Sequence, residues 1–110
     1  MTQEEKQLLL KDLSARLPYD PFIKIGENPH AFKLSQRVRW IYSYGRVENM
    51  FDNTKPYLRP MSSMTEEECK EVGEHITIYD TVDWMNEHHF DYRGLIPMGL
   101  AIEAPEGMYK

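Results

Sequence analysis

The sequence predicts an α+β fold, in which a small antiparallel sheet of three or four strands has about three helices packed mainly on one face. Leucines recur at helical spacing in the first 17 residues, whereas short runs rich in Phe, Ile, Val, Tyr and Trp fill residues 21–51. Two helix-start signals follow after residue 60. The expected order of helix, strands and helices is typical of α+β domains.

The first helix is expected over residues 2–17. Thr2 and Glu5 have the spacing of a capping box, in which each side chain accepts a hydrogen bond from the backbone N–H of the other residue. Leu9 and Leu13 lie one helical turn apart, and Pro18 prevents the helix from continuing. The leucine stripe should therefore face the core.

The middle of the chain is expected to form a strand meander. The predicted strands are residues 22–25, 31–34, 38–44 and 47–51. Side chains alternate along a strand, so the third run would turn one set of side chains toward the core: Val38, Trp40, Tyr42 and Tyr44. Arg37 and Arg39 would then face solvent. Such short connections join antiparallel neighbours.

A loop and a second helix are expected next. Residues 53–63 contain two prolines and no periodicity, which indicates a loop. Thr65 and Glu68 repeat the capping-box spacing, and Gly73 is a natural stop, so the second helix should run between Thr65 and Gly73. Cys69, at the fourth helical position, is expected to be buried in a hydrophobic staple.

The third helix should begin at a cap formed by Asp80 or Thr81 and end near His89. Residues 94–104 alternate small and apolar side chains, which indicates a turn and an edge strand. The side chains expected in the core are Leu9, Leu13, Leu17, Trp40, Tyr42, Val72, Val82, Trp84, Met85, Leu95 and Ile96.

Length and composition predict one soluble domain, residues 1–110. A chain of 110 residues is too short for two independent cores, and its 41% hydrophobic content excludes a disordered chain. Cys69 is the only cysteine, which excludes an intramolecular disulfide and a multi-cysteine zinc site. No apolar run approaches the ~20 residues of a membrane helix. We therefore expect a cytoplasmic protein.

Charge is distributed unevenly along the chain. Residues 1–60 carry ten Lys or Arg against seven Asp or Glu, whereas residues 61–110 carry three against eleven. The two halves therefore attract each other, and the favoured interpretation is that they pack together while the acidic helices face solvent. The alternative is a basic surface that binds an anionic partner. The net charge of -5 disfavours binding to nucleic acid at long range.

Several literal stretches of the chain carry a family resemblance. They are MTQEEKQLLLKDL at residues 1–13, ARLPY at 15–19, KPYLRPMSSMTEEE at 55–68, DW at 83–84, HHFDYRGLI at 88–96 and APEG at 104–107. In these stretches the chain resembles a family of short uncharacterised proteins encoded by gut bacteria and their phages or mobile elements. The resemblance implies a single domain with a variable β-rich middle, and it implies no activity, cofactor or catalytic residue.

The histidines and Asp91 are the densest group of candidate metal ligands or acid–base residues. His88 and His89 are adjacent, so on a helix their side chains diverge by about 100° and do not aim at one metal. Glu71 and His75 are four residues apart, the spacing of two ligands on one helix, but the sequence predicts no third ligand beside them. We therefore expect no metal, no cofactor and no catalytic residue, and a metal-dependent enzyme is the least favoured of three hypotheses.

Nucleic-acid binding is the second hypothesis, and it rests on the basic segment 33–59. This window carries six Lys or Arg against two acids. Its candidate phosphate contacts are Arg37, Arg39, Arg46, Lys55 and Arg59. Single-strand readers place aromatic rings and cations on one open sheet face, whereas the predicted alternation puts Trp40 and Arg39 on opposite faces.

The leading hypothesis is a non-enzymatic interaction or regulatory module that binds a protein partner or forms a homodimer. No set of residues supplies a nucleophile, a base and an orienting group together. The candidate partner-binding residues are Asp91, Tyr92 and Arg93, since Tyr and Arg are common interface hot spots. An Asp91–Arg93 bond and a positive φ angle at Gly94 would instead lock a turn.

Overall fold

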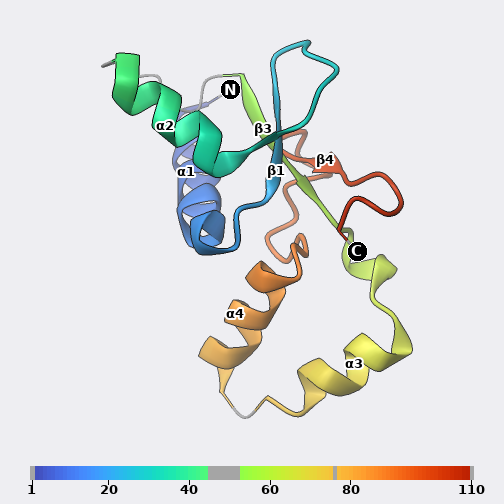
Figure 1. Ribbon diagram of the computed structural model, residues 1–110. Helices are drawn as coiled ribbons and strands as arrows, with labels where there is room; N and C mark the ends of the chain where they lie inside the picture. The colour runs from blue at the N-terminus through green and yellow to red at the C-terminus, as the bar shows by residue number, and fades with distance from the viewer. Residues whose placement is uncertain (1, 45–52, 76, 110) are drawn as a thin grey trace.

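The computed structural model describes residues 2–44, 53–75 and 77–109, which form an α+β fold, as predicted (Figure 1). Its helices and strands are α1 (Gln3–Arg16), β1 (Phe22–Ile25), β2 (Phe32–Lys33), α2 (Leu34–Tyr44), β3 (Thr54–Leu58), α3 (Glu66–Gly73), α4 (Ile78–Glu87) and β4 (Ile102–Glu103). Short 3-10 turns follow α1 at Leu17–Tyr19 and β3 at Met61–Ser63.

The capping boxes set the starts of α1 and α3, as predicted. In α1, Glu5 N donates to Thr2 Oγ1 over 3.1 Å, and Thr2 N donates to Glu5 Oε1 over 2.8 Å. Thr65 and Glu68 make the same reciprocal pair at the start of α3, which ends at Gly73. These signals are local, so the sequence alone predicts them well.

α4 begins earlier than predicted. Thr77, not Asp80 or Thr81, is its cap, because Thr77 Oγ1 accepts a hydrogen bond from Asp80 N over 3.1 Å. The helix ends at Glu87, so the expected end at His89 is two residues too long. His89 has a φ angle of 63°, which no α-helix accommodates.

The strand predicted at residues 38–44 is wrong, because these residues lie in α2. Leu34, Val38 and Ile41 recur at helical spacing, a pattern hidden by aromatic and β-branched residues that are usually more frequent in strands. Val38 packs on a core cluster formed by Leu9, Leu13, Ile23 and Leu34. Trp40 is 37% exposed and contacts Phe32 edge-to-face, with 5.4 Å between the ring centroids. The strand predicted at residues 47–51 lies outside the described residues.

The described strands form one mixed sheet in the order β2-β1-β3-β4. β1 is antiparallel to both β2 and β3, whereas β3 and β4 are parallel, so the prediction of an antiparallel sheet is wrong for this last pair. The chain passes through α3 and α4 between β3 and β4, and this long connection permits parallel pairing. β4 lies within the tail predicted to hold an edge strand.

The loop predicted at residues 53–63 contains β3. Thr54, Pro56 and Leu58 are buried on one face of this strand, while Lys55 and Tyr57 are only half-buried on the other. Proline is rare inside a sheet because it has no N–H to donate. Pro56 therefore concealed a strand whose buried residues alternate regularly.

The core of the described residues contains two hydrophobic clusters. The first joins α1 and α2 to one face of the sheet through Leu9, Leu13, Ile23 and Leu34, and Figure 1 shows these two helices on the same side of β1. The second cluster lies around the end of β3 and the segment before β4, and it contains Leu58, Leu95, Leu100 and Ala101. Within the described chain, α3 has no buried residue.

Four of the predicted core residues are buried, namely Leu9, Leu13, Trp84 and Leu95. Four more are partly buried, namely Val72, Val82, Met85 and Ile96. Leu17 and Trp40 are exposed, and the side chain of Tyr42 lies outside the described part of the chain. Cys69 is exposed, so its predicted burial is wrong: it lies on α3, which packs no residue into the core.

A buried ion cluster joins α1 to the segment after α4. Asp12 and Arg16 have no exposed side-chain surface, and Arg16 Nε lies 2.8 Å from Asp12 Oδ2. Arg93 Nε reaches the other Asp12 oxygen at 3.1 Å, and Arg16 Nη2 donates to the Phe90 carbonyl over 2.6 Å. Asp12 therefore supplies a shared counter-charge to two cations that would otherwise lie buried or half-buried without one.

The substitution Asp12→Ala should lower the free energy of unfolding by about 3–5 kcal/mol, because it leaves the Arg16 charge buried without a partner. Urea denaturation measures this change. Lys11→Ala is the matched control at an exposed neighbouring position and should stay within about 0.5 kcal/mol of the wild type. A loss below about 1 kcal/mol for Asp12→Ala would contradict the importance of the cluster.

Candidate functional site

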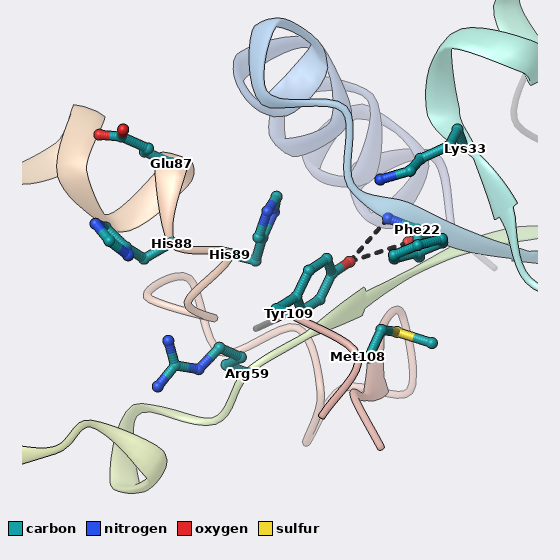
Figure 2. Close-up of a pocket in the computed structure, with 8 residues that line it drawn as sticks. All are labelled: Phe22, Lys33, Arg59, Glu87, His88, His89, Met108 and Tyr109. Atoms are coloured by element: carbon teal, nitrogen blue, oxygen red, sulfur yellow. Dashed lines mark hydrogen bonds between the residues drawn. The ribbon is translucent and has the colours of Figure 1, made fainter. Parts of the chain in front are cut away.

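A pocket of about 430 Å³ lies between the strands and the end of α4, and Figure 2 shows its lining. Basic and aromatic side chains dominate this lining, which consists of Phe22, Lys33, Arg59, Glu87, His88, His89, Met108 and Tyr109. The volume lies within the usual range of small-molecule sites, about 300–1,000 Å³. The pocket is therefore the candidate functional site.

Tyr109 links the pocket to the sheet. Its hydroxyl accepts a hydrogen bond from Phe22 N over 2.8 Å and donates to the Tyr57 carbonyl over 2.7 Å. It thereby bridges β1 and β3 next to the Ile23–Pro56 pair, the end of their ladder. Burial raises the pKa of Tyr109 above its ordinary value. The hydroxyl thus stays protonated and holds the ring as a fixed wall of the pocket.

His89 stacks on this wall. Its ring centroid lies 3.9 Å from that of Tyr109, and the two planes differ by 19°. Burial, reinforced by the positive charges of Arg16 and Lys33, lowers the pKa of His89 to about 4. Its Nδ1 atom is buried and makes no hydrogen bond within the described structure. At neutral pH the imidazole is therefore uncharged, and its environment is electropositive.

Lys33 contributes a positive charge to the pocket and makes no ion pair among the described residues. Its Nζ lies 3.9 Å from the centroid of the Phe22 ring and 3.4 Å from the Asp20 carbonyl oxygen. The Asp20 carboxylate itself accepts hydrogen bonds from Ser35 N and Ser35 Oγ, both over 2.9 Å. No carboxylate of the described residues forms an ion pair with Lys33.

Arg59 is a pocket cation whose charge is already balanced. Its guanidinium binds the Glu68 carboxylate with two bonds of 2.8 and 2.7 Å and lies 4.1 Å from the Phe90 ring centroid. The hydrogen bonds from Arg59 lower the pKa of Glu68 to about 2. Figure 2 shows the carboxylate of Glu87 turned away from the Tyr109 ring. Lys33 is therefore the pocket's free cation among the described residues.

The residues predicted to bind nucleic acid lie on several elements. Arg37 and Arg39 are two residues apart on α2, so they point in directions about 200° apart and share no face. Lys55 lies on β3, and Arg59 follows that strand and binds Glu68. Arg46 lies outside the described residues. The strand face expected to carry Arg37 and Arg39 does not form.

Asp91, Tyr92 and Arg93 all have partners within the fold. Asp91 accepts hydrogen bonds from the amides of Leu95 and Ile96 over 2.8 and 2.9 Å. The expected Asp91–Arg93 bond is wrong, since the Arg93 side chain lies against the carboxylate of the α1 ion cluster. The Tyr92 hydroxyl donates to Asn86 Oδ1, and Gly94 has the predicted positive φ angle, 74°. The turn is thus held by a carboxylate that binds backbone amides.

Two of the histidines, His75 and His88, lie beside the Trp84 ring. The ring centroid of His88 lies 4.2 Å and that of His75 6.5 Å from the Trp84 centroid, and Phe90 stacks on Trp84 at 5.6 Å. The indole N–H donates to Glu71 Oε1 over 3.0 Å. Across residues 2–44, 53–75 and 77–109, no three His, Cys, Asp or Glu side chains are placed to hold a metal ion.

Sequence reasoning missed five pocket residues: Phe22, Lys33, Glu87, Met108 and Tyr109. The contact between Phe22 and Tyr109 joins positions 87 residues apart, and no periodicity in the tail predicts it. One signal was available in the sequence. Side chains alternate along the predicted strand at residues 22–25, so Phe22 and Lys24 lie on the face opposite Ile23 and away from the core.

Comparisons of the chain with protein-family models, with curated proteins and with solved structures found no match. No helix in the described part of the chain has the length and apolar character needed to cross a membrane. The function must therefore be inferred from the pocket itself.

The ion pair between Arg59 and Glu68 predicts a pH dependence of stability. Because the pKa of Glu68 is about 2 in the folded protein and near 4.5 when unpaired, the pair contributes fully above pH 4.5. That contribution is lost as the pH falls toward 2. At neutral pH, Glu68→Gln should cost about 1 kcal/mol, and this difference should shrink as the pH falls through that window.

Thermal or urea unfolding at a series of pH values measures this difference. Glu67→Gln is the matched control, because Glu67 is exposed in the same helical turn. Its difference from the wild type should stay within about 0.5 kcal/mol at every pH. A cost of Glu68→Gln that does not change between pH 7 and pH 2 would contradict the prediction.

Proposed function

We propose that the protein is a non-enzymatic binding module whose pocket receives an anionic small molecule. The observation that carries this proposal is the ammonium group of Lys33, which lies in a pocket of ligand size without an ion-pair partner among the described residues. A partly desolvated cation favours an anion in its pocket, because the attraction is stronger there than in bulk water.

The electrostatic surroundings of the pocket support an anionic ligand. After burial, the strongest causes that lower the pKa of His89 include the positive charges of Arg16, Lys33 and Arg59. A bound anion would offset this field, which now disfavours a proton on the imidazole. The pocket therefore favours negative charge.

The arrangement favours binding over catalysis. A histidine that acts in general acid–base catalysis is commonly oriented by a hydrogen-bond partner such as a carboxylate. The ring of His89 is held by stacking on Tyr109, and no described carboxylate forms a hydrogen bond with it. The Tyr109 hydroxyl is already occupied by two backbone groups. These contacts hold the rings of His89 and Tyr109 in fixed positions, and they leave the Tyr109 hydroxyl unavailable as a nucleophile.

A regulatory or interaction role in the cytoplasm agrees with the rest of the chain. Cys69 is a free, exposed thiol, which suits a reducing compartment. Ligand binding would stabilise the junction of α4, β1 and the C-terminal segment. The surface of α4 around Ile78 and Tyr79 is exposed and is available to a protein partner or a second copy. We propose that ligand binding regulates a partner through the stabilised junction and the exposed surface of α4.

Titration of His89 by NMR, with and without inorganic phosphate, tests the proposed function. The pKa of His89 should rise from about 4 when phosphate binds, because the anion favours the charged imidazolium. Lys33→Gln should weaken phosphate binding about tenfold, as expected for loss of a charged contact. Lys11→Gln, at an exposed site on α1, is the matched control and should leave the affinity unchanged. A His89 titration that no phosphate concentration alters would contradict the proposal.

A further inference from the structure

The sheet face opposite the first core cluster carries three lysines. Lys24 on β1 is the direct antiparallel partner of Lys55 on β3, and Lys33 on β2 is the partner of Phe22. Phe22 and Lys24 are two residues apart on one strand, so all four side chains share one face. Ile23, between them, is buried against the helices on the other face.

The juxtaposition of Lys24 and Lys55 is unfavourable by itself. Like charges directly opposite each other on neighbouring strands destabilise a sheet. The ion pairs of the described residues use Arg16, Arg59 and Arg93, so none neutralises either lysine. Both lysine residues are also partly buried. A pair placed this way is suited to an anion that bridges both ammonium groups.

The lysine pair lies on the same sheet face as Lys33 of the pocket. Lys33 lines the pocket and pairs across the strands with Phe22, which precedes Lys24 by two residues on β1. Lys33 and Lys24 are therefore diagonal neighbours on the sheet. One repeat of two residues corresponds to about 7 Å. A ligand that reaches from the pocket to the lysine pair therefore needs two or more anionic groups at short spacing.

We propose that Lys24 and Lys55 form a second anion subsite, and that the ligand is a small molecule with a chain of phosphates that also contacts Lys33. This inference rests on the proposed function and names its ligand class. Lysine ammonium groups are compact point charges that bind phosphate oxygens from several directions, so they suit a flexible phosphate chain.

A small molecule is favoured over a nucleic acid by the charge of the chain. The net charge is -5, and residues 61–110 carry eleven acids against three bases. A long polyanion would meet this acidic half, whereas a short phosphate chain contacts only the pocket and the lysine face. The rings of Phe22, His89 and Tyr109 are also packed on Lys33 or on each other, which leaves little surface for stacking successive bases.

Calorimetric titration with inorganic phosphate and with tripolyphosphate tests this inference. Wild-type protein should bind tripolyphosphate at least tenfold more tightly than phosphate. The double variant Lys24→Gln/Lys55→Gln should lose about tenfold in tripolyphosphate affinity and keep its phosphate affinity within about twofold. The double variant Lys6→Gln/Lys11→Gln removes the same charge from exposed positions of α1 and should match the wild type.

Thermal unfolding of the ligand-free variants supplies a second readout. Removal of the opposed lysines should leave the midpoint equal to that of the wild type or raise it, since a repulsive pair is lost. A lower midpoint would show that the two lysines serve the fold and would overturn the inference. The affinity measurement tests the inference for a double variant that unfolds cooperatively with a midpoint equal to or above that of the wild type.

The remaining outcomes separate the two proposals. If phosphate binds but tripolyphosphate binds no more tightly, or if Lys24→Gln/Lys55→Gln changes neither affinity, the second subsite is overturned and the proposed function stands. If neither probe binds, both fail. Single-stranded oligothymidylate is the third probe: tighter binding than tripolyphosphate, with a steep dependence on salt, would overturn the assignment to a small molecule in favour of nucleic acid.

Discussion

Arg16 is a cation without exposed surface, and the junction between the two halves of the chain depends on satisfying its charge. Asp12, one helical turn earlier, supplies the counter-charge, and the Phe90 carbonyl, 74 residues later, accepts a second hydrogen bond. A buried ion pair is seldom a net gain in stability over apolar packing, yet removal of one partner is costly. The pair therefore specifies where the segment after α4 must lie on α1, rather than merely adding stability.

The placement of Phe90 positions the pocket. The amide of Arg59 donates to the His89 carbonyl over 2.7 Å, and the amide of Asp91 donates to the Arg59 carbonyl over 2.8 Å. These two bonds form a parallel bridge between Arg59 and Phe90, just beyond the end of β3. The bridge holds His89 where its ring stacks on Tyr109. The Arg16 charge also contributes to the positive field at His89. One buried arginine thus links the architecture of the molecule to the electrostatics of its pocket.

Local signals in the sequence predicted the fold class, whereas long-range pairings escaped it. The capping boxes at Thr2 and Thr65 need only neighbouring residues, so α1 and α3 were predicted nearly to the residue. Aromatic and β-branched residues concealed the helical period of α2, and Pro56 concealed β3. The pocket was not predicted, because it depends on Tyr109 reaching Phe22 across 87 residues and on which lysines share a sheet face.

Amide hydrogen exchange of the Arg16→Met variant tests most directly whether Arg16 positions the pocket. This variant removes the bond from Arg16 to the Phe90 carbonyl together with the ion pair between Arg16 and Asp12, and it leaves Asp12 paired with Arg93. We predict at least about tenfold faster exchange at the amides of Arg59 and Asp91, with no change at Gly26, whose amide bonds Asn53 at the far end of the β1–β3 pair. Unchanged exchange at Arg59 and Asp91, or equal acceleration at all three amides, would contradict the account.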